Sequence, residues 1–466
     1  MVEVVPKDQE KKKASRTRRR LLLGLPLLIV AGGLFVFAPA MERIFAGLFG
    51  KQDDNYSLIA VYADDREESS FLHGVELAVE HINASPEKVL GKELDLGLVC
   101  EDKITSKTEL ETTVAKTLKL SDGIAHSRNL VAVVGHEKSD TAITASSVYA
   151  RNNVLFMATH ATATSLTNHS FETVFALRPD NELNANLIGT YALKHGYSRF
   201  IILSDKSDYG KESSNFFTET ITRAGATVVF RSYLSGTSRS IDDLLMFILD
   251  NKLFKRTDFD AFFVVSSSLS ETAEFIKRAR NLGLDVPVFG MEYMFSDVIE
   301  KTVGKEGMRD VFGVSFYDRD STVSERAKAF IQQYGDAFGG LPDRNAVLGY
   351  DSTMLVRDAV NRARTIDADR VSDTLKIARY KRPFVGVTCP LVFDRNGLIT
   401  DTEIYIVRHD GTAFHTVSAI KIPLERNFGS GSYSRKVEGS DPAAPSAVQA
   451  GADYGEHSLD MERNGQ

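Results

Sequence analysis

The sequence predicts an α/β protein with two lobes, each built on an open parallel sheet that helices cover on both faces. From residue 56 onward, short apolar runs alternate with amphipathic stretches, which is the pattern of repeated strand and helix units. The chain has 466 residues, 43% of them hydrophobic and 26% charged, which suits a globular protein too long for a single core. We therefore expect two consecutive doubly wound sheets.

The first series of units begins with a buried strand over 57–63 and a helix over 71–84. Apolar side chains recur at helical spacing in the second segment, which predicts that one face of the helix packs on the sheet. The alternation continues with strands over 93–100, 130–135 and 154–159 and with helices over 106–120 and 140–151.

The second series starts with a helix over 183–195. It continues with strands over 199–204, 226–230, 261–266, 287–290 and 310–316 and with helices over 210–224, 241–251, 270–282, 323–338 and 346–364. Ligands of such sheets bind beyond the carboxyl ends of the strands, so the loops at those ends are the expected place for a site.

The N-terminus has the pattern of an export signal. A basic arm over 1–20 precedes a segment over 21–40, whose apolar stretch over 21–38 is long enough to form roughly 27 Å of helix and to span a bilayer. The positive-inside rule then places the arm in the cytoplasm and the folded part on the periplasmic side of the inner membrane, behind a single-pass transmembrane anchor. Residues 38–40, Ala-Pro-Ala, also fit a signal peptidase site, so cleavage near Ala40 and release as a soluble periplasmic protein stays open.

The composition and the missing motifs exclude several classes of protein. A net charge of -7, with the only dense basic block at the N-terminus, argues against binding of nucleic acid. The sequence lacks the phosphate-loop string, the dinucleotide glycine pattern, G-x-S-x-G and H-E-x-x-H, so we expect no enzyme, no cofactor and no metal site. Few large apolar residues remain near the C-terminus, and we expect 425–466 to be a disordered tail.

Five segments in sequence order resemble the type I periplasmic binding proteins, specifically their leucine/isoleucine/valine-binding branch. They read HGVELAVEHINA, LVAVVGHEKSDTAITASSVYARNNVLFMATHAT, LSDKSDYGKE, FIKRARNLGLDVPVFGMEY and GVTCPLVFDRNGLI. The resemblance extends from about residue 57 to about residue 420. It implies a hinge of three strands, with lobe one formed by 56–179 plus 315–365 and lobe two by 180–314 plus 366–420.

The function that this resemblance implies is capture of a small solute outside the cytoplasm. The ligand would be an amino acid or a similar small zwitterion, held between the lobes and passed to a membrane permease of an ABC-type uptake system. The alternative keeps the fold and changes the role, to a membrane-tethered ligand sensor or envelope-assembly protein with a signalling partner.

The first candidate site residue is Ser139, which falls where the helix over 140–151 should begin. Serine is a favoured N-cap residue, so an ordinary helix cap is one interpretation. The resemblance implies instead that its hydroxyl and the N–H groups of the first turn bind a ligand α-carboxylate, helped by the helix dipole. Asp140 departs from the family pattern, because its carboxylate would repel that of the ligand unless it points away.

The loop over 159–164 supplies the next candidates. Small neighbours such as Ala161 permit close approach of a ligand to its hydroxyls, although polar loops of this kind are commonly just solvated. The resemblance implies that Thr162 is a second carboxylate-binding hydroxyl. His160 stands where the family usually has a small residue, and it is either a ligand contact or a structural histidine. Lys138 also stands where an apolar residue is common, and together these departures argue against a plain aliphatic ligand.

Two candidates come from the second lobe. The resemblance implies that Tyr209 packs on the ligand as the cleft closes, although a core or edge tyrosine is the alternative. Glu292 follows a short strand and matches the family acid that pairs with the ligand ammonium group. Such an ion pair is selective in a water-poor cleft, because loss of one partner leaves the other unpaired and costly. The serines at 266–268 replace an aromatic that is common there, and they make the pocket more polar.

Overall fold

The computed structural model describes residues 55–63, 69–101, 110–234, 241–250, 252–318, 324–387 and 389–422. The predicted basic arm, the apolar segment over 21–40 and the tail over 425–466 lie outside these residues. Within the described ranges, no helix is both long and apolar enough to cross a bilayer.

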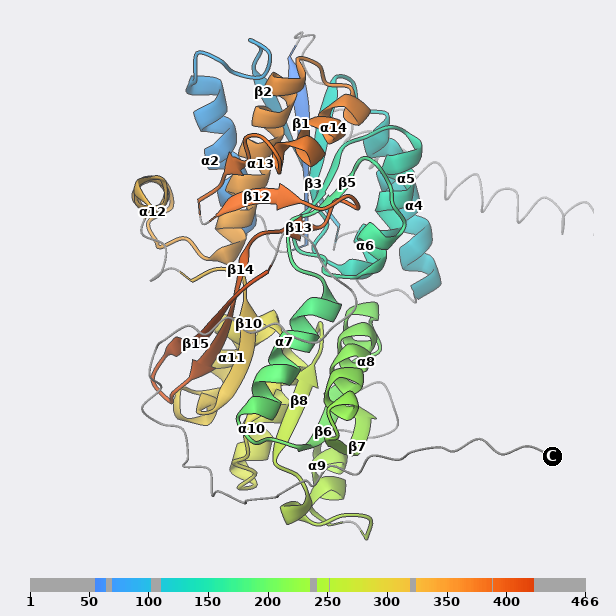
Figure 1. The fold of residues 1–466 in the computed structure, drawn as a ribbon, viewed down its shortest axis with the longest axis vertical. Helices are drawn as coiled ribbons and strands as arrows, with labels where there is room; N and C mark the ends of the chain where they lie inside the picture. The colour runs from blue at the N-terminus through green and yellow to red at the C-terminus, as the bar shows by residue number, and fades with distance from the viewer. Residues whose placement is uncertain are drawn as a thin grey trace, which may run out of the picture.

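Lobe one, the upper lobe in Figure 1, is built on a five-stranded parallel sheet with the order β2-β1-β3-β4-β5. Its strands are β1 (Tyr56–Tyr62), β2 (Leu94–Cys100), β3 (Leu130–Gly135), β4 (Phe156–Ala158) and β5 (Val174–Ala176). The sheet is covered on both faces by helices α2 (Ser70–Ala84), α4 (Leu110–Ala125), α5 (Ser139–Arg151) and α13 (Arg344–Ala363), and the short α6 (Ser165–Asn168) precedes β5.

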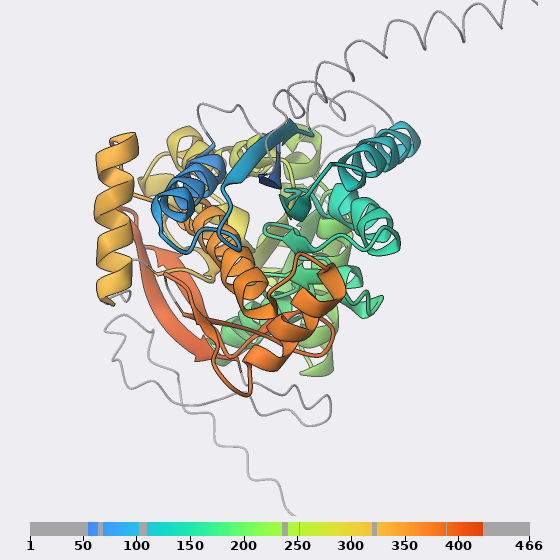
Figure 2. The ribbon, with the colours of Figure 1, turned by 90° about the horizontal axis from the view of Figure 1, so that it is seen from above.

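Strand β1 shows why a continuous apolar run forms this sheet. Leu58 and Ala60 pack into the core shared with α2 and α13, whereas Ile59 and Val61 pack into the core shared with α4 and α5. A strand covered on both faces needs apolar side chains at every position rather than at alternate ones. Figure 2 shows the two helix layers on opposite sides of the sheet, with α2 and α13 (blue and orange) facing away from α4 and α5 (cyan).

Helices α2 and α13 approach each other closely at two glycines. A Cβ atom on Gly74 would lie 2.0 Å from the carbonyl oxygen of Ala346, and one on Gly349 would lie 2.1 Å from that of Phe71. No side chain fits at either distance, so this helix contact depends on glycine at both positions. The contact fixes the start of α13, which reaches the junction between the lobes (Figure 1).

Lobe two is built on a seven-stranded sheet with the order β15-β14-β10-β9-β8-β6-β7. Its strands are β6 (Arg199–Ser204), β7 (Thr227–Tyr233), β8 (Ala261–Val265), β9 (Val288–Gly290), β10 (Val311–Ser315), β14 (Glu403–His409) and β15 (Phe414–Lys421). The first five are parallel, and β14 and β15 add to the edge in antiparallel orientation. Helices on its faces are α7 (Asn181–Lys194), α8 (Asp208–Arg223), α9 (Ile241–Leu249), α10 (Leu269–Asn281) and α11 (Asp297–Val303), with short 3-10 helices η1 (Arg256–Asp258), η2 (Glu292–Phe295) and η3 (Glu306–Met308).

The chain passes between the lobes three times, after β5, after β10 and after β13 (Ile399–Thr400). The third crossing corrects the expected division at 365/366. Helix α12 (Glu325–Phe338) and then α13 come before that point in the chain. The residues beyond it form α14 (Ala368–Ala378), β11 (Phe384–Val385), β12 (Pro390–Phe393) and β13. Val371, Leu375 and Phe393 pack into the same core as Leu58, so this segment belongs to lobe one. Only the strands β14 and β15 return to lobe two.

Candidate functional site

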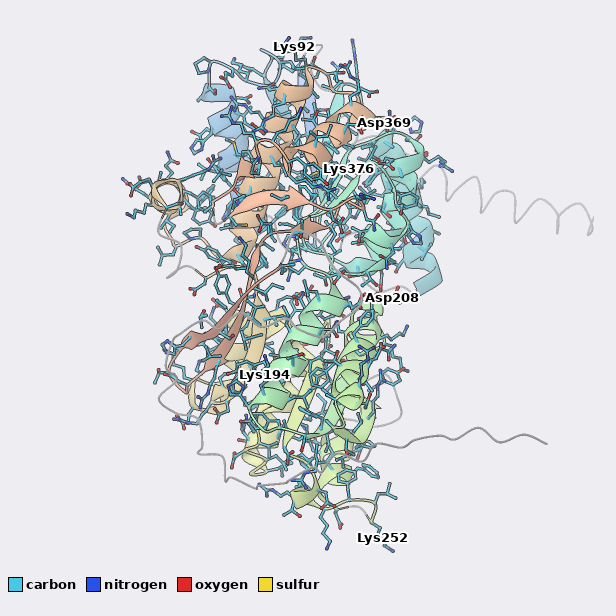
Figure 3. All side chains as sticks on the ribbon, in the orientation of Figure 1. Lys92, Lys194, Asp208, Lys252, Asp369 and Lys376 are labelled. Atoms are coloured by element: carbon cyan, nitrogen blue, oxygen red, sulfur yellow. The ribbon has the colours of Figure 1, made fainter. Side chains whose placement is uncertain are left out.

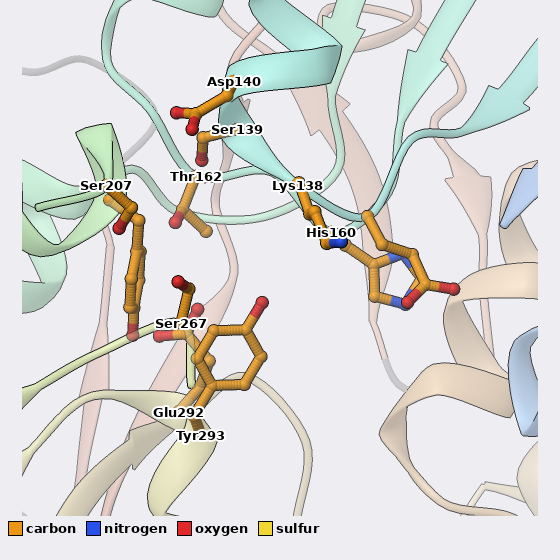
Figure 4. A pocket seen from close by; sticks show the side chains of 11 residues that line it. Lys138, Ser139, Asp140, His160, Thr162, Ser207, Ser267, Glu292 and Tyr293 are labelled. Atoms are coloured by element: carbon orange, nitrogen blue, oxygen red, sulfur yellow. The ribbon is translucent and has the colours of Figure 1, made fainter. Parts of the chain in front are cut away.

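A pocket lies between the lobes, at the carboxyl ends of their parallel strands (Figure 4). It measures about 410 Å³ when the part open to solvent is included. Its eleven lining residues are Glu137, Lys138, Ser139, Asp140, His160 and Thr162 from lobe one and Ser207, Tyr209, Ser267, Glu292 and Tyr293 from lobe two. The structure therefore brings together Ser139, His160, Thr162, Tyr209 and Glu292. Ala161 is instead only 1% exposed and packs in the lobe-one core.

The lobe-one wall begins at the end of β3. Gly135 has φ +120°, and a Cβ atom there would lie 2.0 Å from the carbonyl oxygen of Val61. His136 follows with φ 55°, a left-handed conformation that is uncommon for a residue with a side chain. Two contacts hold its buried ring, with Nδ1 2.9 Å from a carboxylate oxygen of Glu101 and Nε2 3.0 Å from the hydroxyl of Tyr149. This turn aims the start of α5 at the pocket.

Ser139 is the first residue of α5, and Lys138 is its N-cap residue without a capping side-chain hydrogen bond. The expected N-cap is therefore displaced by one residue. The hydroxyl of Ser139 makes no hydrogen bond to any residue that the structure describes, although the side chain is 7% exposed. It stands at a helix end, where backbone N–H groups have no partner inside the helix and the dipole favours an anion.

Thr162 faces the pocket from the next loop but already has a partner. Its hydroxyl donates to Oδ1 of Asn181 at 2.6 Å, and its carbonyl oxygen accepts from the backbone N–H of Asn181 at 2.7 Å. The hydroxyl must turn away from Asn181 before it can donate to a ligand. The lone pairs of its oxygen remain available to a donor.

His160 packs edge to face on Phe71, with ring centroids 4.9 Å apart, and its Nδ1 lies 2.8 Å from the hydroxyl of Thr159. Its other ring nitrogen, Nε2, is buried without a hydrogen-bond partner. Burial, and then the positive charges of Arg178 and Arg344, lower the pKa of His160 to about 3. The imidazole is therefore neutral at pH 7, and Nε2 is a donor or an acceptor according to the tautomer.

The lobe-two wall is organised by Asp205, which the sequence analysis missed. One carboxylate oxygen accepts from the hydroxyl of Ser207 at 2.5 Å, and the other accepts from the hydroxyl and the backbone N–H of Ser267, both at 2.6 Å. Ser207 also caps α8 by accepting from the N–H of Gly210 at 3.0 Å. A single aspartate directly after β6 thus joins two loops of the pocket. Its position at the end of a strand could have identified it from the sequence.

Glu292 is almost fully buried and forms an ion pair with Arg178, which the sequence analysis also missed. Nη2 of Arg178 lies 3.0 Å from Oε1 of Glu292, and the two side chains are 5% and 3% exposed. Arg178 donates in addition to the carbonyl oxygen of His160 at 3.1 Å and lies 4.9 Å above the ring of Phe316. The second carboxylate oxygen of Glu292, Oε2, has no hydrogen-bond partner. Arg178 thus pairs with one oxygen of the Glu292 carboxylate, and the other oxygen is available to a ligand.

Two tyrosines complete the lobe-two wall. Tyr209 and Tyr293 pack edge to face, with ring centroids 5.3 Å apart. Burial, followed by the negative charge of Glu292, raises the pKa of both phenols, so both stay protonated at neutral pH. Neither hydroxyl makes a hydrogen bond within the described part of the chain, and each can donate to or accept from a ligand.

Direct contacts also join the lobes beside the pocket. Glu212 of α8 accepts from the backbone N–H of Thr164 at 3.2 Å, from the hydroxyl of the same residue, and from Nδ2 of Asn181 at 2.6 Å. Asp140 of lobe one accepts from the backbone N–H of Asp208 in lobe two at 3.3 Å. Figure 3 shows Asp208 at the junction of the lobes. Burial and then the nearby Asp208 raise the pKa of Asp140.

A metal centre finds no support in this arrangement. Across the described residues, His, Cys, Asp and Glu side chains form no group of three or more that could hold an ion. The chemistry that the pocket offers is hydrogen bonding and charge pairing.

The chain is similar to known proteins in both sequence and fold. Residues 62–416 match the sequence model of a family described as periplasmic binding protein. A leucine-, isoleucine-, valine-, threonine- and alanine-binding protein from Pseudomonas aeruginosa is 22% identical over 344 residues, which cover 73% of this chain and 85% of that protein. A leucine binding protein from Thermotoga maritima shares the fold with a TM-score of 0.67 at 19% identity, over 78% of this chain and 99% of that one.

A further solved structure widens the range of ligands seen with this fold. It is a solute binding protein of an ABC transporter from Rhodopseudomonas palustris BisB5 in complex with 3,4-dihydroxy benzoic acid. The TM-score is 0.65 at 19% identity, over 80% of this chain and 98% of that one.

Proposed function

Because the chain belongs to the periplasmic binding protein family, in the type I branch of the branched-chain amino-acid receptors, we propose that it captures an amino acid or a similar small zwitterion between its lobes. It then delivers this solute to the permease of an ABC-type uptake system. Members of this family are binding proteins, and the chain is not an enzyme.

The observation that carries the amino-acid proposal is the unpartnered Oε2 atom of Glu292. A buried carboxylate oxygen without a donor costs free energy, and a ligand ammonium group supplies both the donors and the opposite charge. Arg178 occupies the other oxygen, so the carboxylate is oriented before the ligand arrives. This preorganisation favours a cation of ammonium size at one defined place.

The opposite wall of the pocket suits the other end of a zwitterion. Ser139 offers a free hydroxyl at the N-terminus of α5, where the helix dipole favours a carboxylate. Ser139 comes from lobe one and Glu292 from lobe two, so one small ligand that binds both groups draws the lobes together. Tyr209 and Tyr293 then cover the ligand from lobe two.

The protein acts outside the cytoplasm, as its family does. We propose further that the apolar segment over 21–40 holds it to the inner membrane with residues 1–20 in the cytoplasm. The tether would keep the binding lobes close to the permease. Cleavage near Ala40 would remove it, and the mass of the mature protein recovered from membranes distinguishes the two forms.

The test is calorimetric titration and thermal denaturation of the purified protein with each of the twenty amino acids. A ligand present at 100 times its Kd should stabilise the protein by about 2.7 kcal/mol and raise Tm accordingly. Glu292→Gln should weaken binding by about 2 to 5 kcal/mol, because the ammonium group loses its charged partner. Glu325→Gln, at a side chain that is 90% exposed, is the matched control and should bind like the wild type. Absence of binding by every amino acid would refute the proposal.

A further inference from the structure

The residues that line the pocket differ from those expected in a pocket for aliphatic side chains. Among the described residues that form its wall, none is alanine, valine, leucine, isoleucine or methionine, and the aromatic rings among them are those of His160, Tyr209 and Tyr293. Binding of a leucine side chain gains free energy in proportion to the apolar surface that it buries against apolar walls. Here the same side chain would cover hydroxyls, carboxylates and an imidazole.

Polar groups without a hydrogen-bond partner within the described residues line the pocket from both lobes. They are the hydroxyls of Ser139, Tyr209 and Tyr293, Nε2 of His160 and Oε2 of Glu292. The α-carboxylate takes Ser139 and the ammonium group takes Glu292. The ring nitrogen of His160 then remains, and an aliphatic side chain packed against it would bury it without a partner, at a cost in free energy.

Positive charge next to His160 favours oxygen atoms in the ligand. Arg178 is paired with Glu292, but Arg344 forms no ion pair with any residue that the structure describes, and its guanidinium lies 5.7 Å above the ring of Phe295. Arg344 is close enough to His160 and Tyr293 to affect the protonation of both. Its positive charge, which also lies near the carboxylates of Glu292 and Asp343, attracts the negative end of a carbonyl, hydroxyl or carboxylate group.

We propose, on the basis of the function proposed above, that the protein selects amino acids with oxygen-bearing side chains over aliphatic ones, and that His160 determines this preference. The ligand side chain lies against His160 and accepts from or donates to its Nε2 atom. Hydroxyl, amide and carboxylate side chains all meet this requirement. Discrimination of this kind is strong, because a site built for hydrogen bonds leaves buried groups unpaired when the ligand lacks them.

The test compares L-serine, L-threonine, L-asparagine, L-glutamine, L-aspartate and L-glutamate with L-leucine, L-isoleucine and L-valine by calorimetric titration of the full chain. We expect the best ligand of the first group to bind at least about tenfold more tightly than any of the second. If leucine, isoleucine or valine binds as tightly as the best polar ligand, this inference is refuted while the proposed amino-acid function stands. If none of the twenty amino acids binds, both proposals fail.

Variants at His160 test its role separately. His160→Ala should weaken the best polar ligand by about tenfold and change leucine by less than about twofold, whereas His160→Gln should restore part of the loss because an amide also donates and accepts. His126→Ala, at an exposed histidine of lobe one, is the matched control and should leave all affinities unchanged. Thermal denaturation confirms that each variant is folded. An equal loss for polar and aliphatic ligands in His160→Ala would show that His160 does not set the preference.

Discussion

Arg178 and Glu292 form a buried ion pair of 3.0 Å between a crossing segment and lobe two. Arg178 follows β5 in the first crossing, donates to the carbonyl oxygen of His160 in lobe one, and lies above Phe316 in the second crossing. One side chain therefore contacts both lobes and two of the three segments that join them. The positive charge that orients the Glu292 carboxylate is therefore held by the hinge itself.

Removal of Arg178 should destabilise the protein strongly. Arg178→Ala leaves the buried carboxylate of Glu292 without a counter-charge, which typically costs about 3 to 5 kcal/mol in the free energy of unfolding. Urea denaturation measures the loss. Arg309→Ala, which removes an exposed arginine paired with Glu306, should cost less than about 1 kcal/mol. Equal effects of the two variants would contradict the importance of the buried pair.

Glu212 should hold the lobes together through its contacts with Thr164 and Asn181. In Glu212→Gln, the amide has one acceptor oxygen in place of two and no charge, so hydrogen bonds worth about 1.5 to 3 kcal/mol are weakened. We expect a larger radius of gyration of the unliganded protein by small-angle X-ray scattering and a ligand affinity reduced by about tenfold. Glu219→Gln, on the same helix with a side chain 59% exposed, is the control. An unchanged radius and affinity in Glu212→Gln would exclude this role.

Gly210 should tolerate no side chain, because its Cβ position lies 2.0 Å from a carboxylate oxygen of Asp205. Gly210→Ala displaces the aspartate that holds Ser207 and Ser267, and we expect a loss of about 1 to 3 kcal/mol in stability together with weaker ligand binding. Gly335→Ala is the control within another helix, since the nearest atom to its Cβ position is 3.5 Å away. This change should be neutral or stabilising by up to about 1 kcal/mol. Thermal denaturation of both variants decides the matter.

Asp351 should make stability fall as the pH rises from about 4 to 7. Burial raises its pKa to about 7 from 3.8, although both carboxylate oxygens accept from the N–H of Val387 at 2.9 Å. Between these values the folded state holds a proton that the unfolded state has lost, so raising the pH favours unfolding until the folded pKa is passed. Asp351→Asn removes this dependence, and its stability relative to the wild type should increase from pH 4 to 7 and then level off.

Urea denaturation at several pH values measures the difference between Asp351→Asn and the wild type. Asp336→Asn, at an exposed position of α12, serves as the control and should follow the wild type over the whole range. A constant difference between Asp351→Asn and the wild type would show that Asp351 does not titrate in this window.

Most of the strands and helices up to residue 364 could be predicted within a few residues, because buried parallel strands are continuous apolar runs bounded by amphipathic helices. Strands β3 and β6 have the predicted limits. The short β5 was not predicted, since three residues carry too little pattern. The segment from α14 to β13 was placed in the wrong lobe, because an apolar stripe shows that a helix is buried but not which core receives it.

The sequence predicted where the pocket lies, but it did not predict the ion pair between Arg178 and Glu292. Ser139 and Glu292 stand at strand ends, where the topology of an open sheet places a ligand. Arg178 offered no such signal, because its partner is more than a hundred residues away and the pairing depends on how the lobes meet. Asp205 was overlooked although it follows β6 directly. His160 was noticed as a departure, but only the structure shows that its ring is buried against Phe71 and that its Nε2 atom has no partner.

The late third crossing has a consequence for biosynthesis. Lobe one lacks β12 and β13, and lobe two lacks β14 and β15, until residues 390–421 have been made. Phe393 and Ile399 belong to the first core, and Ile404 and Ile406 to a core of the second. Neither lobe can therefore close its core while the chain is still being extended, and such contacts between distant segments form slowly. This order of synthesis delays folding until nearly the whole two-lobed region exists.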